Sequence, residues 1–560
     1  MTDTLEFPRG IERGAVIAPL ASSYWFLPDA LEKEAQNSES DFAYHKGKIW
    51  LGRTPTMARE PVGWMDDRHV VTIAGSRAGK GVSAIIPTLC EYPGSVICID
   101  PKGENAFRTA SRRGFGTSRI KGLRQDVYVL DPYGVSGVPG EYLATFDPLA
   151  GLSPDDEDTL EEAILIAEAL IVSADQRDAH WDDSARALVE ALILHVISAP
   201  EFEDDRTLGR VRLLLRDGDR VLFDALQADP EVGSDPLEGE TPPATPFEAL
   251  LWAMETNHAF DGLISGVAQG VRDLADRERA SVLSTARRNL KFLDAPRMRR
   301  CLQSSDHTLS LEDLKRAPNG VSVYLVLPSR LMKAHSRWMR LMLSLTVARL
   351  ERDDTAPATD HPVLAIVDEF PTLGPMPILE AAVGYMAGFG LKIWAILQDL
   401  SQLKRDYPKS WETFLGNAGL LQFFGNTDPT TLEFIAKRLG ELEVLTEVVN
   451  QSDTETITVA DISDFDKLRR MTEKKGLAGF FGSFALDENT KSSTKSGASG
   501  QTVSRSVQKT ALMGPDEIRR HFARETQLQI IATAEHAALF VRRTPYYADP
   551  YFAGKYAEKR

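Results

Sequence analysis

The chain has 560 residues, too many for one hydrophobic core, so two or three domains are expected. Hydrophobic residues at 43% and charged residues at 26% exclude a wholly disordered protein. A formal net charge of -17 argues against a generally basic nucleic-acid binder, although an acidic exterior can enclose a locally basic channel. Cys90, Cys98 and Cys301 lack metal-ligand spacing and an even count, which argues against a zinc site or a disulfide framework.

The first 68 residues contain short apolar runs that are too short to span a membrane. Residues 15–28 form the most apolar run, but Pro19, Ser22 and Ser23 interrupt it. A helix needs roughly 20 apolar residues to cross the hydrocarbon core. The run also lacks the basic start and the cleavage site of a signal peptide. We therefore expect residues 1–68 to form an N-terminal approach segment of a cytoplasmic protein, which would reach the inner membrane only through a partner.

The first motif lies at residues 69–87, HVVTIAGSRAGKGVSAIIP. Its apolar residues predict a buried strand that ends at Ala74, and helical spacing begins after a glycine-rich turn. Such a turn surrounds phosphates with backbone N–H groups, and Lys80 adds a positive charge for the β- and γ-phosphates. Ala74 and Gly81 depart from the strict P-loop pattern G-x-x-x-x-G-K-[ST], so an ordinary glycine turn remains the alternative for this motif alone. The predicted phosphate-binding residues are Ser76, Arg77, Ala78, Gly79, Lys80, Gly81 and Val82.

Two further strands complete the first part of the predicted nucleotide-binding domain, residues 69–152. Residues 95–99 form one strand, which ends in DPKGE at residues 100–104, and residues 127–130 form the other. Polar residues at strand ends mark the ligand-binding edge of open α/β sheets. Alternatively, Asp100 caps a turn that Gly103 permits, and the sequence does not choose between these interpretations.

Helical periodicity dominates from residue 153 to residue 300, where β-branched runs disappear. Examples are residues 160–172, 185–197, 208–215 and 282–293. We therefore expect an inserted all-α domain over residues 153–300. Residues 234–246 are rich in Pro, Glu and Gly and predict an exposed loop within it.

The second motif belongs to residues 301–560, the predicted second part of the nucleotide-binding domain. Strand signals return at residues 321–327, a helix is expected at 336–350, and VLAIVDE occupies residues 363–369. The five apolar residues predict a buried strand that delivers Asp368 and Glu369 to its end. Asp368 suits the Mg²⁺ of bound ATP as a metal ligand, and Glu369 suits the water that attacks the γ-phosphate. Adjacent carboxylates also occur as helix caps, but the upstream P-loop favours the catalytic interpretation.

The next predicted strand, residues 392–397, ends at Gln398, where a side chain can contact the γ-phosphate. Lys80, Glu369 and Gln398 are therefore the predicted catalytic residues, with ATP and Mg²⁺ as cofactors. A strand at residues 419–424 precedes a less regular tail from about residue 441. Residues 488–506 are rich in Ser, Thr, Gly and Lys and predict a mobile loop. A helix that starts at Pro515 and a hairpin of residues 528–532 and 538–541 close the chain.

In their order along the chain, these segments resemble the TraG-like type IV secretion coupling proteins, which also tolerate Ala and Gly at the two departing P-loop positions. The similarity is carried by AGSRAGKGVSAIIP at 74–87, DPKGE at 100–104, Trp181, VDEFPTLG at 367–374, MAGFG at 386–390, Gln398, Gln402, Leu403, Tyr407, Gly416, Asn417, PDEI at 515–518, Tyr546 and Tyr547. It implies an α/β fold, namely a RecA-like P-loop nucleotide-binding domain with a mostly parallel sheet and an inserted all-α domain.

The resemblance also implies an ATPase that acts as a hexamer on DNA or a relaxase–DNA complex, together with components of a type IV secretion channel. Family members usually carry an N-terminal transmembrane hairpin, which this sequence does not show. A separate membrane anchor and a monomer in isolation are therefore compatible with the sequence. Arg330, Arg337 and Arg340 are the candidates for an arginine finger.

Three functions are compatible with these motifs. We expect a coupling ATPase that recruits or translocates DNA or nucleoprotein. The second is a recruitment module whose helical domain binds cargo while nucleotide only sets the assembly state. The third is a DNA motor in DNA processing or defence.

Overall fold

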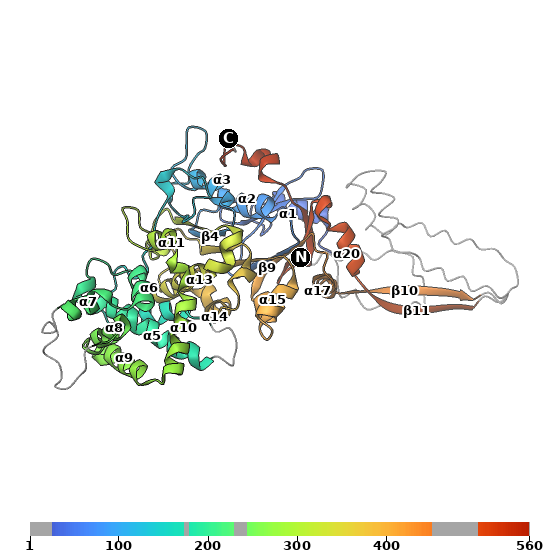
Figure 1. Ribbon diagram of the computed structural model, residues 1–560. Coiled ribbons are helices and arrows are strands. Elements are labelled where there is room, and N and C mark those ends of the chain that lie inside the picture. The colour runs from blue at the N-terminus through green and yellow to red at the C-terminus, as the bar shows by residue number, and fades with distance from the viewer. Residues whose placement is uncertain (1–24, 173–178, 229–242, 451–501, 559–560) are drawn as a thin grey trace, which may run out of the picture. The chain divides into compact units, whose positions relative to one another are not determined.

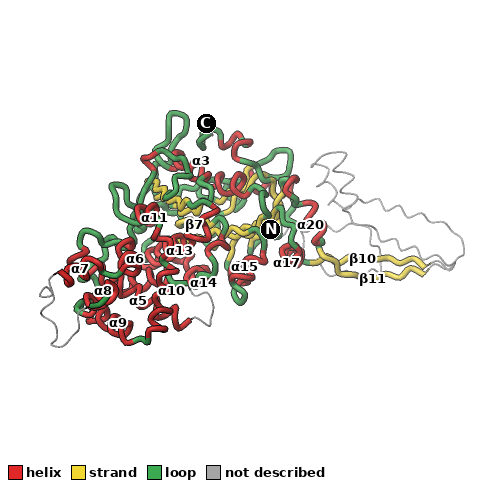
Figure 2. The backbone as a smooth tube through the Cα atoms, viewed as in Figure 1, coloured by secondary structure: helices red, strands yellow, loops and turns green. Residues whose placement is uncertain are grey.

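The computed structural model describes residues 25–172, 179–228, 243–450 and 502–558. The chain forms two compact units. Unit 1 comprises Met1–Tyr92 and Ile396–Phe552, and unit 2 comprises Pro93–Ala395 and Ala553–Arg560. Each unit contains part of a β-sheet and several helices (Figures 1 and 2).

Unit 1 contains strands in the order β2-β1-β13-β12-β9-β3. Their bounds are β1 Ile49–Arg53, β2 Pro61–Trp64, β3 His69–Ala74, β9 Ala418–Phe424, β12 Leu528–Thr533 and β13 Leu539–Arg542. Strands β3 and β9 are parallel, with Ala74 opposite Phe424, and the other neighbouring pairs are antiparallel. All residues of β3 and β9 are buried, which explains why both strands read as apolar runs in the sequence.

The helices of unit 1 border these strands along the chain. Their bounds are α1 Pro28–Gln36, α2 Ile86–Glu91, α15 Leu400–Asp406, α16 Trp411–Gly416, α17 Pro429–Leu439 and α20 Pro515–His521. The predicted start of α20 is confirmed, because Pro515 is its first residue. The Glu517 carboxylate also accepts a 2.8 Å hydrogen bond from the Gly514 N–H. Among the described residues, no helix combines the length and hydropathy needed to cross a membrane.

Two long strands in unit 1 correct the sequence-based interpretation of the tail. Strand β10 (Glu441–Asn450) pairs antiparallel with β11 (Thr502–Ala511), and Figure 1 shows them side by side. The prediction of an irregular tail from residue 441 is therefore wrong for 441–450. The predicted loop at 488–506 is likewise wrong for 502–506, where β11 begins, while residues 488–501 lie outside the described part. Long-range pairing with β10 outweighs the polar composition of this segment, as strand propensity depends on context.

Unit 2 contains parallel strands in the order β8-β7-β4-β6-β5. Their bounds are β4 Val96–Asp100, β5 Asp126–Leu130, β6 Val321–Val326, β7 Val363–Val367 and β8 Leu391–Leu397, the last two residues of β8 falling in unit 1. Strands β4, β6, β7 and β8 are buried throughout. Burial on both faces is typical of the central strands of a parallel sheet.

The described elements between residues 153 and 300 are helical. They include α4 Thr159–Leu170, α5 Ala179–Ser198, α6 Leu208–Asp217, α7 Arg220–Ala228, α8 Pro246–Glu255, α9 Leu263–Asp273, α10 Asp276–Asn289 and α11 Pro296–Cys301. Helix α5 packs against α4, α6, α9 and α10. Figure 2 shows α5, α6, α9 and α10 grouped together. Elsewhere in unit 2, the bounds of further helices are α3 Glu104–Arg113, α12 Asp313–Arg316, α13 Ser329–Arg352 and α14 Pro377–Tyr385.

Candidate functional site

The predicted phosphate-binding residues form one loop at the end of β3 in unit 1. The Gly75 N–H donates to the Phe424 carbonyl at 3.2 Å, which attaches the start of the loop to the end of β9. A Cβ on Gly75 would lie 1.9 Å from the Gly425 carbonyl oxygen, so only glycine fits this close approach. Ala74, Ala78 and Phe424 form a buried apolar cluster beneath the loop. The loop therefore rests on packed strands.

The backbone of the loop adopts conformations that turn its N–H groups. Arg77 has φ 57° and Gly79 has φ 96°, both in the left-handed region. Lys80 is half-buried and helical, and a π-helical turn, Gly81–Ile85, leads into α2. Successive N–H groups in such left-handed and helical turns form anion-binding concavities. This geometry suits a phosphate-binding loop at a helix N-terminus.

Gly81 and Ser83 determine whether the loop has a hydroxyl group available for a metal ion. A Cβ on Gly81 would meet no atom within 4 Å, so the glycine is not required by packing against the protein. The Ser83 hydroxyl donates to the Gly79 carbonyl at 2.8 Å and thereby stabilises the turn. Gly81 has no side-chain oxygen for a metal ion, as the sequence predicts.

Arg543 also contacts this loop and was missed by sequence analysis. It follows β13, and its guanidinium donates a hydrogen bond to the Ala78 carbonyl. The contact joins residues 465 positions apart, so no local sequence pattern predicts it. Only tertiary structure identifies Arg543 as a neighbour of the loop.

Gln398 directly follows β8 and belongs to unit 1, like the loop. Its side chain is half-buried, and its N–H donates to Gln402 Oε1 at 3.1 Å. Asp399 caps α15 by accepting from the Gln402 N–H at 3.0 Å. These contacts fix the backbone of Gln398, whose side chain is predicted to contact the γ-phosphate.

The predicted carboxylate pair lies in unit 2, directly after the buried strand β7. Asp368 and Glu369 are half-buried, and the Glu369 N–H donates to Asp368 Oδ1 at 3.1 Å. Glu369 adopts φ 60°, a left-handed conformation that is uncommon for a residue with a side chain. Thr372 holds the turn through its N–H and its hydroxyl, each 2.8 Å from the Glu369 carbonyl. Glu369 precedes the 3₁₀ helix Phe370–Leu373 as its N-cap residue, but no side chain caps that helix.

Asp100 caps the turn at the end of β4, as one of the two interpretations of the sequence predicts. Its carboxylate accepts hydrogen bonds from the Ala106 N–H at 2.9 Å and the Lys102 N–H at 3.4 Å. It thereby satisfies the start of α3, while Gly103 supplies a left-handed turn with φ 67°. Burial raises the pKa of Asp100 to about 7, with Asp368 adding to the shift and the backbone N–H groups opposing it.

Two of the three arginine-finger candidates are bound within unit 2. Arg340 is buried and donates to the carbonyls of Leu373 and Pro375 at 2.9 and 2.7 Å. Arg337 is half-buried, and its Nε donates to Asn289 Oδ1 at 2.8 Å. Arg330 is exposed at the start of α13. Arg340 therefore fixes the segment that follows Glu369, and Arg330 is the most accessible of the three.

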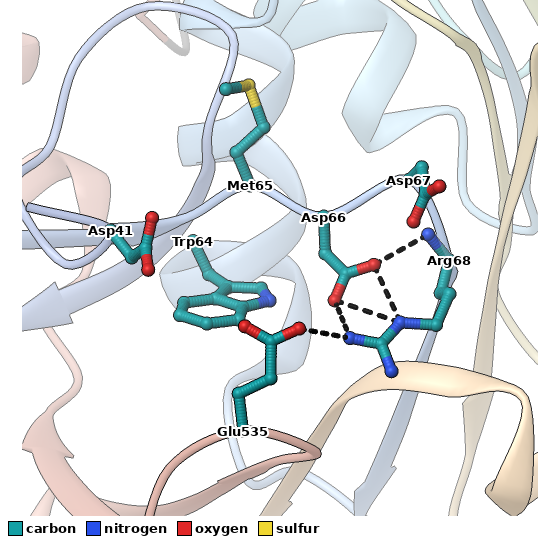
Figure 3. Close-up of a pocket in the computed structure, with 7 residues that line it drawn as sticks. All are labelled: Asp41, Trp64, Met65, Asp66, Asp67, Arg68 and Glu535. Carbon is teal, nitrogen blue, oxygen red and sulfur yellow. Dashed lines mark hydrogen bonds and ion pairs between the residues drawn. The ribbon is translucent and has the colours of Figure 1, made fainter.

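A separate acidic pocket of about 250 Å³ lies in unit 1 (Figure 3). Arg68 pairs with Asp66 at 2.5 Å and with Glu535 at 3.3 Å. Burial opposes ionisation of Asp66, but the hydrogen bonds from Arg68 dominate and lower its pKa. A pocket with this surplus of carboxylates repels polyphosphates, so it does not suit the nucleotide. Its lining residues are Asp41, Trp64, Met65, Asp66, Asp67, Arg68 and Glu535.

Comparison with known proteins identifies relatives of the chain. A family model described as type IV secretory system conjugative DNA transfer matches residues 28–471. The conjugal transfer protein TraG of Escherichia coli is 26% identical over 400 residues, which cover 69% of this chain and 57% of TraG. Protein VirD4 of Rhizobium radiobacter is 28% identical over 397 residues, which cover 70% of this chain and 50% of VirD4. The chain thus spans little more than half the length of these relatives.

Solved structures of the bacterial conjugative coupling protein TrwB have a similar fold. The unbound form of TrwBdeltaN70 is 13% identical with a TM-score of 0.57, and the match covers 93% of each chain. TrwB in complex with a non-hydrolysable ATP analogue is 14% identical with a TM-score of 0.53, over 90% of this chain and 96% of TrwB. These similarities confirm the predicted fold class, a RecA-like P-loop α/β fold with a mostly parallel sheet.

Proposed function

Because the chain belongs to the type IV secretory system conjugative DNA transfer family, we propose that it is a P-loop ATPase that couples ATP hydrolysis to recruitment or translocation of DNA or nucleoprotein. The observation that carries the proposal is the loop at Ser76–Val82, whose left-handed and helical turns suit a phosphate. TrwB, whose fold is similar, has been solved in complex with a non-hydrolysable ATP analogue. The family functions in conjugative DNA transfer.

The loop residues bind the nucleotide in this proposal. Backbone N–H groups of residues 76–82 donate to phosphate oxygens, except that of Ala78, which donates to the Gly75 carbonyl at 3.1 Å. The Lys80 ammonium neutralises charge on the β- and γ-phosphates. The left-handed Gly79 supports this role, because its φ of 96° is accessible to glycine and strained for other residues. Arg543 adds a second positive charge behind the loop. The residues present therefore fit a polyphosphate.

The carboxylates of unit 2 provide the proposed hydrolytic chemistry. Mg²⁺, when bound with the nucleotide, would neutralise part of the phosphate charge. Asp368 offers a carboxylate oxygen to the metal ion or to its water, a ligand type that Mg²⁺ prefers. Glu369 orients the attacking water and accepts its proton. Gln398 contacts the γ-phosphate, and Gly81 leaves the metal without a hydroxyl ligand from the loop.

The proposed partners and assembly are those expected for a member of this family. The active form is a homo-hexamer that accepts DNA or a relaxase–DNA complex and works with type IV secretion channel components. A channel component or a separate membrane anchor is the proposed partner at the inner membrane. Arg330, the exposed member of the three arginines, is the proposed residue that reaches the nucleotide of a neighbouring subunit.

The proposal is tested by separating nucleotide binding from turnover. We expect Glu369→Gln to lower ATP turnover at least about hundredfold, because a positioned general base contributes that much. Its affinity for ADP should stay within about twofold of wild type, since Glu369 acts on water rather than on the nucleotide. Phosphate release and calorimetric titration with ADP measure the two quantities.

Lys80→Ala is the matched comparison, because it removes a charge that contacts the phosphates. We expect it to weaken ADP binding as well as turnover. Wild-type turnover in Glu369→Gln would contradict the role of Glu369. Equal ADP binding by wild type and Lys80→Ala would contradict the role of the loop.

A further inference from the structure

Arg543 occupies an unusual position for a cation, because its side chain is buried directly beneath the loop. The residue is only 2% exposed. Its N–H donates to the Gln527 carbonyl at 2.7 Å, which fixes its backbone beside the β12–β13 hairpin. The guanidinium lies over the Phe424 ring, 4.3 Å from its centroid, in a cation–π contact. Arg543 is thus held rigidly between the hairpin and the loop.

The charge of Arg543 has no acidic partner among the described residues. Its hydrogen bonds go to the carbonyls of Ala78 and Arg524, the latter at 3.4 Å, and its Nε has no hydrogen-bond partner in this part of the chain. Burial lowers the pKa of Arg543 to about 10, so the side chain stays charged at neutral pH. A buried charge without a counter-ion is costly, which points to an anion that binds nearby.

The contact with Ala78 determines the direction of the next N–H group. The Ala78 carbonyl and the Gly79 N–H belong to one planar trans peptide, so they point in opposite directions. Arg543 holds the carbonyl from behind, and the Gly79 N–H therefore points away from Arg543. Among the described residues, no acceptor is bonded to this N–H group. It is free to donate to a phosphate.

Resting on the nucleotide-binding role proposed above, we propose that Arg543 is a positioning residue for the nucleotide phosphates. It fixes the Ala78–Gly79 peptide so that the Gly79 N–H donates to a phosphate oxygen, and its charge offsets the charge of that phosphate through the peptide. The last hairpin of unit 1 thereby contributes to nucleotide affinity without touching the nucleotide.

The test is calorimetric titration with ADP of wild type, Arg543→Met and Arg543→Lys. Arg543→Met keeps apolar bulk but removes the charge and the side-chain donors, so ADP should bind about tenfold more weakly, the effect of losing one charge-assisted contact. Arg543→Lys keeps one charged donor and should bind about threefold more weakly. Unchanged ADP affinity in both variants would overturn the proposal. Thermal melts establish that each variant folds. If Arg543→Met does not fold, Arg543→Lys alone tests the proposal: a loss of ADP affinity of about threefold supports it, and unchanged affinity overturns it.

Arg53→Met is the matched control, since Arg53 is another largely buried arginine of unit 1. Its guanidinium pairs with Asp549 at 2.6 Å and donates to the Arg59 carbonyl at 2.7 Å, and both of these partners lie outside the loop. We expect this variant to lose stability while binding ADP like wild type. An equal loss of ADP affinity in Arg53→Met and Arg543→Met would show a general structural effect and overturn the positioning role.

Kinetics give a second readout that a structural role would not produce. If Arg543 supports phosphate binding equally in the ground state and in the transition state, its removal weakens both to the same extent. Arg543→Met should then raise the KM for ATP about tenfold and leave kcat within about twofold of wild type. Failure of the proposed function is distinguishable, because wild type and Lys80→Ala would then bind ADP equally. If Lys80→Ala loses ADP affinity but both Arg543 variants do not, only the inference about Arg543 fails.

Discussion

Gly75 and Gly81 stand at opposite ends of the phosphate-binding loop and have opposite steric surroundings. A Cβ on Gly75 would lie 1.9 Å from the Gly425 carbonyl oxygen, whereas a Cβ on Gly81 would meet nothing within 4 Å. We therefore expect Gly75→Ala to lower the free energy of unfolding by about 1–3 kcal/mol, because backbone atoms must move apart. Gly81→Ala lies in a helical turn and should be neutral or slightly stabilising.

Urea denaturation of the two variants measures this difference. Gly75→Ala with wild-type stability would contradict the close packing of the loop against the end of β9. The Gly81→Ala variant controls for the general effect of adding a methyl group to this loop.

Motif residues and supporting residues differ in how well the sequence predicts them. Lys80, Asp368 and Glu369 follow buried strands whose apolar runs are visible in the sequence, and the structure puts each directly after or near such a strand. Their catalytic roles remain predictions. Asp100 was ambiguous, because its role depends on the N–H groups of a helix six residues away. Arg543 was invisible, because its contact with Ala78 forms only when distant segments fold together.

Buried strands were the elements best predicted from the sequence. The predicted strands at residues 95–99, 127–130, 321–327, 363–367, 392–397 and 419–424 correspond closely to β4, β5, β6, β7, β8 and β9. Continuous apolar runs identify such strands, because both faces of a parallel sheet are covered. Helix α1 was missed because it is short and largely polar, and β10 and β11 were missed because their pairing joins segments far apart in the chain.

Helix α5 carries a buried histidine that makes stability depend on pH. His195 Nδ1 lies 3.0 Å from Asn257 Nδ2, so the ring accepts a hydrogen bond in its neutral form. Burial lowers the pKa of His195 from 6.5 to about 4. Above pH 6.5 both the folded and unfolded states hold a neutral ring. As the pH falls from 6.5 to about 4, only the unfolded state gains the proton, so stability is progressively lost.

We expect wild type to lose about 2 kcal/mol more than His195→Gln between pH 7 and pH 5, since one pKa unit corresponds to about 1.4 kcal/mol. Urea denaturation at the two pH values measures the difference. His258→Gln is the matched control, because this residue is exposed in the same helical region, and it should behave like wild type. An equal loss of stability in wild type and His195→Gln would contradict the neutral, buried state of His195.

For the molecule as a whole, family membership covers residues 28–471 and therefore includes both the loop and the carboxylate pair. Members of the family act in conjugative DNA transfer, and we propose that this chain does so as a ring of six copies. We expect the mass in solution to shift from that of one chain to that of six on addition of a non-hydrolysable ATP analogue and DNA. A monomer under all conditions would contradict a self-sufficient ring.

The net charge of -17 limits how such a ring can bind DNA. Binding must rely on a local set of basic residues, because the overall field repels phosphates. Contacts with phosphates release counter-ions, so DNA binding should weaken steeply with salt and depend little on base sequence. A recruitment module that binds only protein cargo would show neither property.

ATP turnover with and without DNA tests the central claim most directly. The account predicts that DNA raises the turnover of wild type, that rising salt removes the increase, and that Glu369→Gln stays inactive in both conditions. Turnover by wild type that is unaffected by DNA, or no greater than that of Glu369→Gln, would contradict the proposal of a DNA-coupled ATPase.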